Sequence, residues 1–105
     1  MTKSIRSLLV LAAAVSLAGA VCSAQSGGQA VYKAKCAMCH GPAGTPSAGM
    51  AKAMGIKPVS DPAIKKLTVD QMAAVVKNGK GKMKPISGLT EAQIKEAVLY
   101  YRGLK

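Results

Sequence analysis

The chain has 105 residues, and its 15 Lys and Arg residues against 4 Asp and Glu residues give a formal charge of +11. This length allows one domain. The positive charge favours acidic partners, but the chain has neither Trp nor Phe and no nucleic-acid-binding motif, which argues against nucleic acid. Its three tyrosines are too few to fill the core of so small a domain unless another group adds to it.

The N-terminus has the pattern of a cleaved export signal. Basic residues precede an apolar segment over 8–21, and small residues follow at 22–24. The apolar segment is shorter than the ~20 residues that span a bilayer, so we expect no stable membrane insertion. We predict a signal peptide over 1–24 and a mature domain of charge +9 over 25–105. An uncleaved anchor and lipid attachment at Cys22 are alternatives.

The next segment predicts a helix that ends in a cofactor-binding motif. From Gly27 onwards the apolar residues fall at helical spacing. The helix leads into Cys36-Ala37-Met38-Cys39-His40, which contains the single histidine of the chain and is the attachment motif of a c-type haem. Two thiols at this spacing reach the two vinyl groups of one porphyrin, and the adjacent imidazole binds the iron. We therefore predict covalent bonds at Cys36 and Cys39, no disulfide between them, and His40 as the proximal ligand.

The remainder predicts short helices joined by long loops. Four further helices are expected, over residues 47–54, 61–66, 68–78 and 90–104. Thr68 and Thr90 each begin a capping box, which marks a helix start. The segment 79–88 is a loop rich in Lys and Gly. Because no segment alternates apolar and polar residues, we expect an all-α fold of four to five helices around one haem.

The second iron ligand decides what such a haem does. With a second protein ligand it transfers electrons, and with an open position it binds gases or peroxide. Met83 lies in a polar loop where an apolar side chain has no local packing role, so we predict Met83 as the distal ligand. Met72 belongs to an apolar helical stripe and is expected in the core. Met38 lies within the motif on the wrong side of the ring, while Met50 and Met54 are candidates for the pocket wall.

The chain resembles the small bacterial monohaem class I c-type cytochromes, of the c6/c553-like kind, over nearly the whole mature domain. Three segments carry the resemblance: 31–41 with the haem motif, 78–83 with the Met loop, and 94–104 at the C-terminus. It implies that the first and last helices cross at close range with Tyr100 at the contact. It also implies that a backbone carbonyl in the loop 42–46 accepts a hydrogen bond from the proximal histidine.

The motif and the resemblance together predict a soluble, monomeric periplasmic electron carrier that is not an enzyme. It would hold one haem c through Cys36, Cys39, His40 and Met83. Lysines near the haem loops would form a basic rim for acidic docking surfaces of redox proteins or respiratory membrane complexes: Lys33, Lys35, Lys52, Lys80, Lys82 and Lys84. An electron-transfer subunit of a larger oxidoreductase is the main alternative. An open-site gas-binding or peroxide-reactive haem protein and a thiol or zinc protein are the others.

Overall fold

The computed structural model describes residues 20–105, with side chains from residue 27 onwards. The helices of this range are α1 (Ala20–Lys35), α2 (Ala37–His40), α3 (Ala48–Met54), α4 (Pro62–Lys65), α5 (Val69–Asn78) and α6 (Glu91–Gly103). The same range contains no strand beyond one isolated bridge, so the all-α prediction is confirmed. Most of the predicted signal peptide lies outside the described residues.

Helix α1 departs from the prediction at both ends. It begins at Ala20, well before the predicted start at Gly27. Glycines weaken a helix interior, but a Cβ at Gly28 would lie 2.4 Å from the carbonyl oxygen of Glu96, so this glycine permits a close approach of α6. At its other end the helix is interrupted at Cys36, whose φ is −117°, far from the helical value. The motif therefore continues as a separate short helix, α2.

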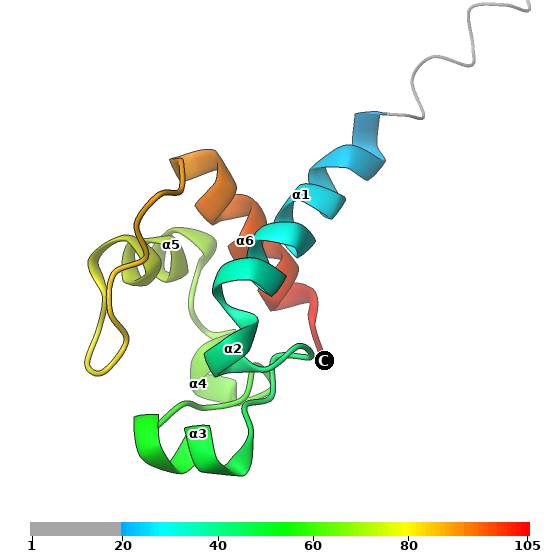
Figure 1. The fold of residues 1–105 in the computed structure, drawn as a ribbon. Coiled ribbons are helices and arrows are strands. Elements are labelled where there is room, and N and C mark those ends of the chain that lie inside the picture. Colours follow the sequence, from blue (N-terminus) through cyan, green and yellow to red (C-terminus); the bar gives the residue numbers. More distant parts are fainter. Residues whose placement is uncertain (1–19) are drawn as a thin grey trace, which may run out of the picture.

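Helices α1 and α6 cross at close range and form the centre of the fold (Figure 1). The side chain of Tyr32 on α1 is fully buried at the crossing. Its ring centroid lies 5.3 Å from that of Tyr100 and 5.8 Å from that of Tyr101, both on α6. Aromatic pairs at these separations attract each other beyond the effect of burial alone. The predicted helix crossing, with Tyr100 at the contact, is confirmed.

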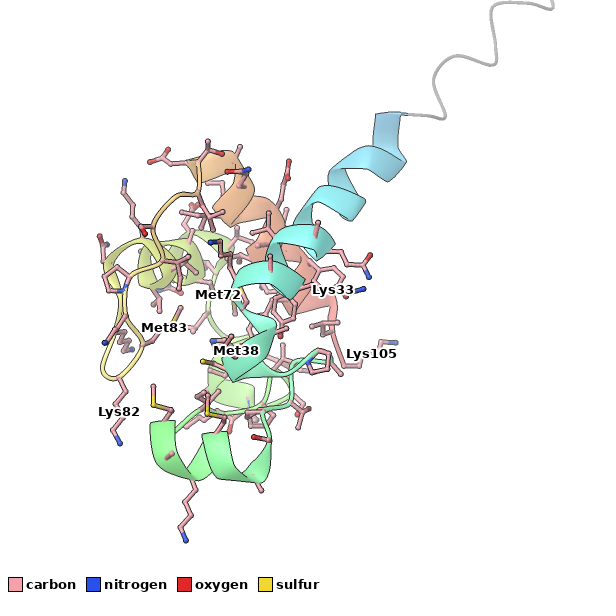
Figure 2. All side chains as sticks on the ribbon, in the orientation of Figure 1. Lys33, Met38, Met72, Lys82, Met83 and Lys105 are labelled. Carbon is pink, nitrogen blue, oxygen red and sulfur yellow. The ribbon has the colours of Figure 1, made fainter. Side chains whose placement is uncertain are left out.

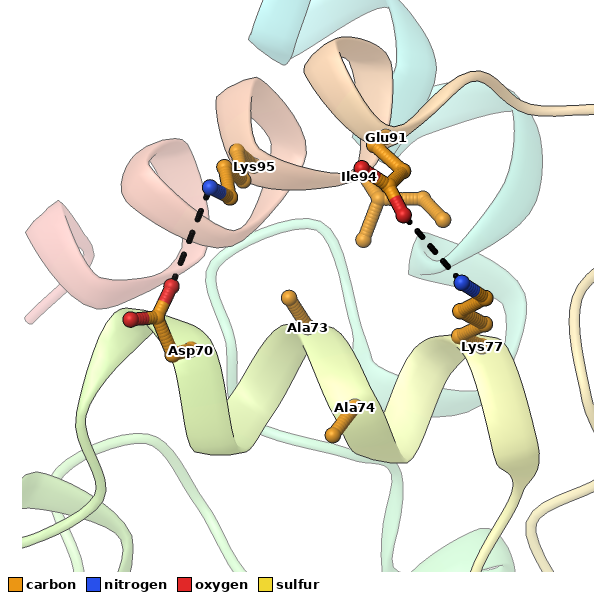
Figure 3. Close-up of a pocket in the computed structure, with 7 residues that line it drawn as sticks. All are labelled: Asp70, Ala73, Ala74, Lys77, Glu91, Ile94 and Lys95. Carbon is orange, nitrogen blue, oxygen red and sulfur yellow. Dashed lines mark hydrogen bonds and ion pairs between the residues drawn. The ribbon is translucent and has the colours of Figure 1, made fainter.

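Helix α5 packs on the other side of α6 through a small apolar cluster. Met72, Ile94 and Val98 are its buried members. The capping boxes predicted at Thr68 and Thr90 are both present, and each fixes the first turn of its helix. Two ion pairs also bridge α5 and α6 (Figure 3): Lys77 with Glu91 at 3.1 Å and Lys95 with Asp70 at 3.8 Å.

The middle of the chain wraps the lower end of this helical core (Figure 1). The Ser47 hydroxyl accepts from the Met50 amide and the Asp61 carboxylate from the Ala63 amide, so α3 and α4 begin where the sequence predicts. The Val59 amide donates to the Gly44 carbonyl at 2.9 Å and ties this segment to the loop after α2. Within residues 20–105, none of the helices is long and apolar enough to cross a bilayer.

Candidate haem site

The fold contains an apolar cavity of about 880 Å³. Its wall comes from α1, α2, α4, α5, α6, the segment 54–57 and the loop 79–88 that joins α5 to α6. The apolar side chains of this wall include Ile64, Leu67, Val75, Val76, Ile86 and Val98. Cofactor pockets in proteins commonly measure ~300–1,000 Å³ and are mostly apolar. The cavity thus has room for a large, flat, apolar group.

The predicted anchor residues lie together on this wall. Cys36 precedes α2, Cys39 and His40 lie on it, and all three side chains line the cavity. Neither cysteine forms a disulfide, and each is partly buried. Burial raises the pKa of the Cys36 thiol, so the unmodified side chain stays protonated near neutral pH. The wall therefore presents two free thiols and one imidazole to the same space.

The His40 imidazole is held in a form that can bind a metal. Burial lowers its pKa, which favours the neutral ring that acts as a ligand. Its Nδ1 atom is buried and has no hydrogen-bond partner. The expected bond to a carbonyl of the loop 42–46 is therefore absent, and that expectation is wrong. The loop instead folds back onto Gly41, where a Cβ would lie only 2.0 Å from the Thr45 carbonyl oxygen.

Two tyrosines surround the proximal side of the site, and the sequence argument gave neither of them a role there. The Tyr101 ring meets the His40 ring edge-on, with centroids 5.5 Å apart and planes at 63°. The Tyr32 hydroxyl donates a buried hydrogen bond of 2.6 Å to the carbonyl oxygen of Gly41, the residue after His40. Burial raises the pKa of Tyr32 far above its usual range, so this hydroxyl keeps its proton and remains a donor.

Met83 reaches the same cavity from the loop 79–88 (Figure 2). Its backbone is fixed by a tight turn: the Lys80 amide donates to the Met83 carbonyl at 2.9 Å, and the Met83 amide donates to the Lys80 carbonyl at 3.0 Å. Gly81 occupies the turn with a φ of 57°, which suits glycine. At the tip, Lys82 Nζ donates to the Ala53 carbonyl at 2.8 Å, near the C-terminal end of α3. Met83 is thereby directed inwards and Lys82 towards α3.

These donors fit a covalently bound haem. Two thiols at the required spacing, a neutral imidazole and a thioether all border one apolar cavity of suitable size. Residues 23–100 match the family described as cytochrome C oxidase, cbb3-type, subunit III. The chain belongs to this family of cytochrome c domains. It is a c-type cytochrome, which implies covalently bound haem c and haem-based electron transfer.

A solved structure supports the same assignment. The KustC0563 c-type cytochrome shares 26% identity with this chain at a TM-score of 0.66. The match covers 74% of this chain and 96% of the other. No curated protein matches the sequence. The predicted small cytochrome fold is therefore confirmed, and its members are typically electron carriers rather than catalysts.

The other methionines of the cytochrome are placed differently from Met83. Met38 is 87% exposed, although it lies between the two cysteines. Met72 is buried in the core, as predicted, and also borders the cavity. Met54 borders it too, whereas Met50 does not. The methionines that line the cavity are thus Met54, Met72 and Met83, and of these only Met83 lies on the loop.

The predicted basic rim is only partly present. Five lysines of the cytochrome line the cavity: Lys35, Lys57, Lys80, Lys82 and Lys84. Lys33 and Lys52 do not line it, and Lys33 points from the side of α1 that faces away from the Met83 loop (Figure 2). Lys57 was missed because Gly55 marks the end of α3 in the sequence but does not show that the following residues lie against the cavity. The positive charge at the cavity is therefore concentrated around the loop 79–88.

Proposed function

We propose that this cytochrome is a soluble periplasmic electron carrier that holds one haem c between His40 and Met83. The proposal rests on the cavity, because its wall includes both cysteines and the histidine of the haem motif together with a loop methionine. When bound, the haem supplies a reversible one-electron couple. A complete pair of protein ligands leaves no open iron position, which favours electron transfer over the binding of gases or peroxide.

Each residue of the site has a separate task in this proposal. Cys36 and Cys39 hold the cofactor covalently, so it is retained in both oxidation states. The buried and neutral His40 supplies the proximal nitrogen. Met83 supplies a soft thioether that favours the reduced iron and raises the potential. The apolar wall keeps water away from the iron and adds to this effect.

Export is proposed on the basis of the signal pattern in the sequence. The family match begins at residue 23, close to the predicted cleavage after Ala24. Cleavage there would remove the first residues of α1 and keep Gly28, which makes the close contact with α6. Lipid attachment at Cys22 is the alternative, and the mass of the exported protein distinguishes the two.

We further propose that the cavity lysines guide the protein to acidic surfaces of its redox partners.

Absorption spectra of the exported holoprotein test the two ligands. We expect sharp c-type bands on reduction and the weak far-red iron–methionine band on oxidation. Met83→Ala should abolish the far-red band and open the reduced iron to carbon monoxide. Met38→Ala is the matched control, because this methionine is exposed and should leave both properties unchanged. A far-red band that persists in Met83→Ala would reject Met83 and direct attention to Met54 or Met72.

A second candidate function has support from the family match. The description of that family names an oxidase subunit, so the same electron transfer could take place within a permanent complex. Fractionation of the native host distinguishes the two. A carrier would be released into the periplasmic fraction as a single small species. A subunit would remain with membranes and migrate with a larger haem-containing complex after detergent extraction.

A further inference from the structure

Tyr32 carries a hydroxyl group that packing alone does not explain. Its side chain is 1% exposed, at the crossing of α1 and α6. The ring contacts Tyr100 and Tyr101, and a phenylalanine ring would make the same contacts. Burying a hydroxyl is unfavourable unless it forms a hydrogen bond. Here it donates to the Gly41 carbonyl oxygen at 2.6 Å, so the hydroxyl has a specific partner.

That partner is the residue immediately after the proposed proximal ligand. Gly41 has a φ of 82°, and the Thr45 carbonyl occupies the place of its absent Cβ, so no other residue type fits. The Gly41 carbonyl also accepts from the Gly44 amide at 3.2 Å. The Tyr32 bond thus joins the end of α2 to the body of α1, which is anchored to α6. This fixes the backbone from which the His40 side chain projects.

His40 has few other contacts that could fix its orientation. Helix α2 spans four residues and has no side-chain cap at its start. The ring nitrogen Nδ1 has no hydrogen-bond partner, although imidazole ligands are commonly oriented through their second nitrogen. The His40 ring meets the Tyr101 ring at an angle of 63°, and the His40 backbone continues into Gly41. Tyr32 contacts both, because it stacks on Tyr101 and bonds to Gly41.

We propose that the Tyr32 hydroxyl is a positioning group for the proximal ligand, which sets the orientation of the His40 imidazole through the Gly41 carbonyl. This inference rests on the proposed function, in which His40 binds the iron. Tyr32 also borders the cavity, but its hydroxyl bonds to the Gly41 carbonyl, so in this proposal the hydroxyl acts through the turn that carries the ligand. Loss of the hydroxyl leaves the Gly41 carbonyl with the longer bond from Gly44 and lets the imidazole plane adopt more than one orientation.

Tyr32→Phe tests the role, because it removes the hydroxyl and keeps the ring. The matched control is Tyr100→Phe, which alters the ring 5.3 Å from Tyr32 and leaves the Gly41 bond intact. The readouts are the electron paramagnetic resonance spectrum of the ferric holoprotein, which responds to the orientation of an axial imidazole, and the redox equilibrium constant against a fixed mediator. In Tyr32→Phe we expect a split or broadened low-spin signal and a change in the constant of about threefold or more.

The two possible failures are distinguishable. Tyr32→Phe with the wild-type spectrum and equilibrium constant overturns the positioning role, even when its melting temperature falls. An equal change in Tyr100→Phe overturns it as well, because the effect then belongs to the aromatic cluster. His40→Ala is measured in the same series. An unchanged low-spin spectrum in that variant overturns the ligation by His40 and, with it, this inference.

Discussion

The two sides of the haem cavity are held by very different means. The proximal wall, formed by α1, α2 and α6, is secured by a buried tyrosine cluster, a close helix crossing and a buried hydrogen bond. The distal loop, residues 79–88, is secured by one tight turn, one hydrogen bond from the Ile86 amide to the Val76 carbonyl of α5, and one exposed lysine. Buried contacts resist local opening and exposed ones do not. The side with the proposed covalent anchors is therefore rigid, and the side with the proposed Met83 ligand is open to adjustment.

The largest effect is expected on removal of the covalent anchors. The double variant Cys36→Ala/Cys39→Ala should give an exported chain that retains no haem. It should show no cooperative thermal transition, because the apolar wall of the cavity of about 880 Å³ then has no haem to pack against. Haem staining after denaturing electrophoresis and thermal circular dichroism measure the two properties. Met38→Ala changes the same motif and should preserve both. A cooperative transition in the haem-free variant would show that the proximal wall folds by itself.

The next largest effect tests the rigidity of the proximal wall. In Gly28→Ala the new methyl group meets the Glu96 backbone at 2.4 Å, and we expect a loss of about 2 kcal/mol in the free energy of unfolding. Gly27→Ala is the control: its Cβ lies 3.0 Å from the movable carboxylate end of Glu96. There the higher helix propensity of alanine should offset the crowding. Denaturant titrations that give equal values for the two variants would remove the close crossing as a source of stability.

A smaller effect is expected at the distal loop. Lys82→Ala removes the bond to the Ala53 carbonyl and should cost about 0.5–1 kcal/mol of loop stability. The loss should appear as faster carbon monoxide binding to the reduced protein, since Met83 leaves the iron more often, with little change in melting temperature. Lys84→Ala removes the same charge and serves as the control. Equal rates in both variants would assign the effect to charge and not to the bond.

The smallest effect is expected at the ion pair between α5 and α6 (Figure 3). Both side chains of the Lys77–Glu91 pair are well exposed, at 62% and 78%. Lys77→Ala should therefore lower the free energy of unfolding by no more than about 0.5 kcal/mol, and salt should remove the difference. A larger loss that persists in high salt would mean that this pair holds α5 to α6 more firmly than its exposure indicates.

Local signals in the sequence predicted much of the fold. The capping boxes at Thr68 and Thr90 are complete within four residues, so they specify helix starts without tertiary information. The haem motif is also complete within five consecutive residues, so it can be identified without knowledge of the fold. Met83 could be singled out because its chemistry conflicts with its polar surroundings. The cavity contact of Met83 agrees with this, while its bond to iron stays a prediction.

The remaining features depend on contacts between distant segments. The early start of α1 was missed because Gly27 and Gly28 look like a helix break until α6 lies against them. The bond from Tyr32 to Gly41 requires the chain to turn back on itself after the motif. The assumed hydrogen bond of His40 is absent, and the loop that was expected to supply its acceptor packs closely on Gly41. Residue spacing in the sequence predicts none of these three contacts between distant segments.

The turn that presents Met83 is nearly self-contained. Both of its hydrogen bonds join Lys80 to Met83, and Gly79, with a φ of 77°, lets Pro85 pack against it. Residues 79–85 thus form the turn among themselves, while the bond from Lys82 to Ala53 fixes how the turn lies against α3. A designed haem-binding helical bundle that borrowed residues 79–85 to present a methionine would therefore also need a carbonyl acceptor for the lysine at the position of Lys82.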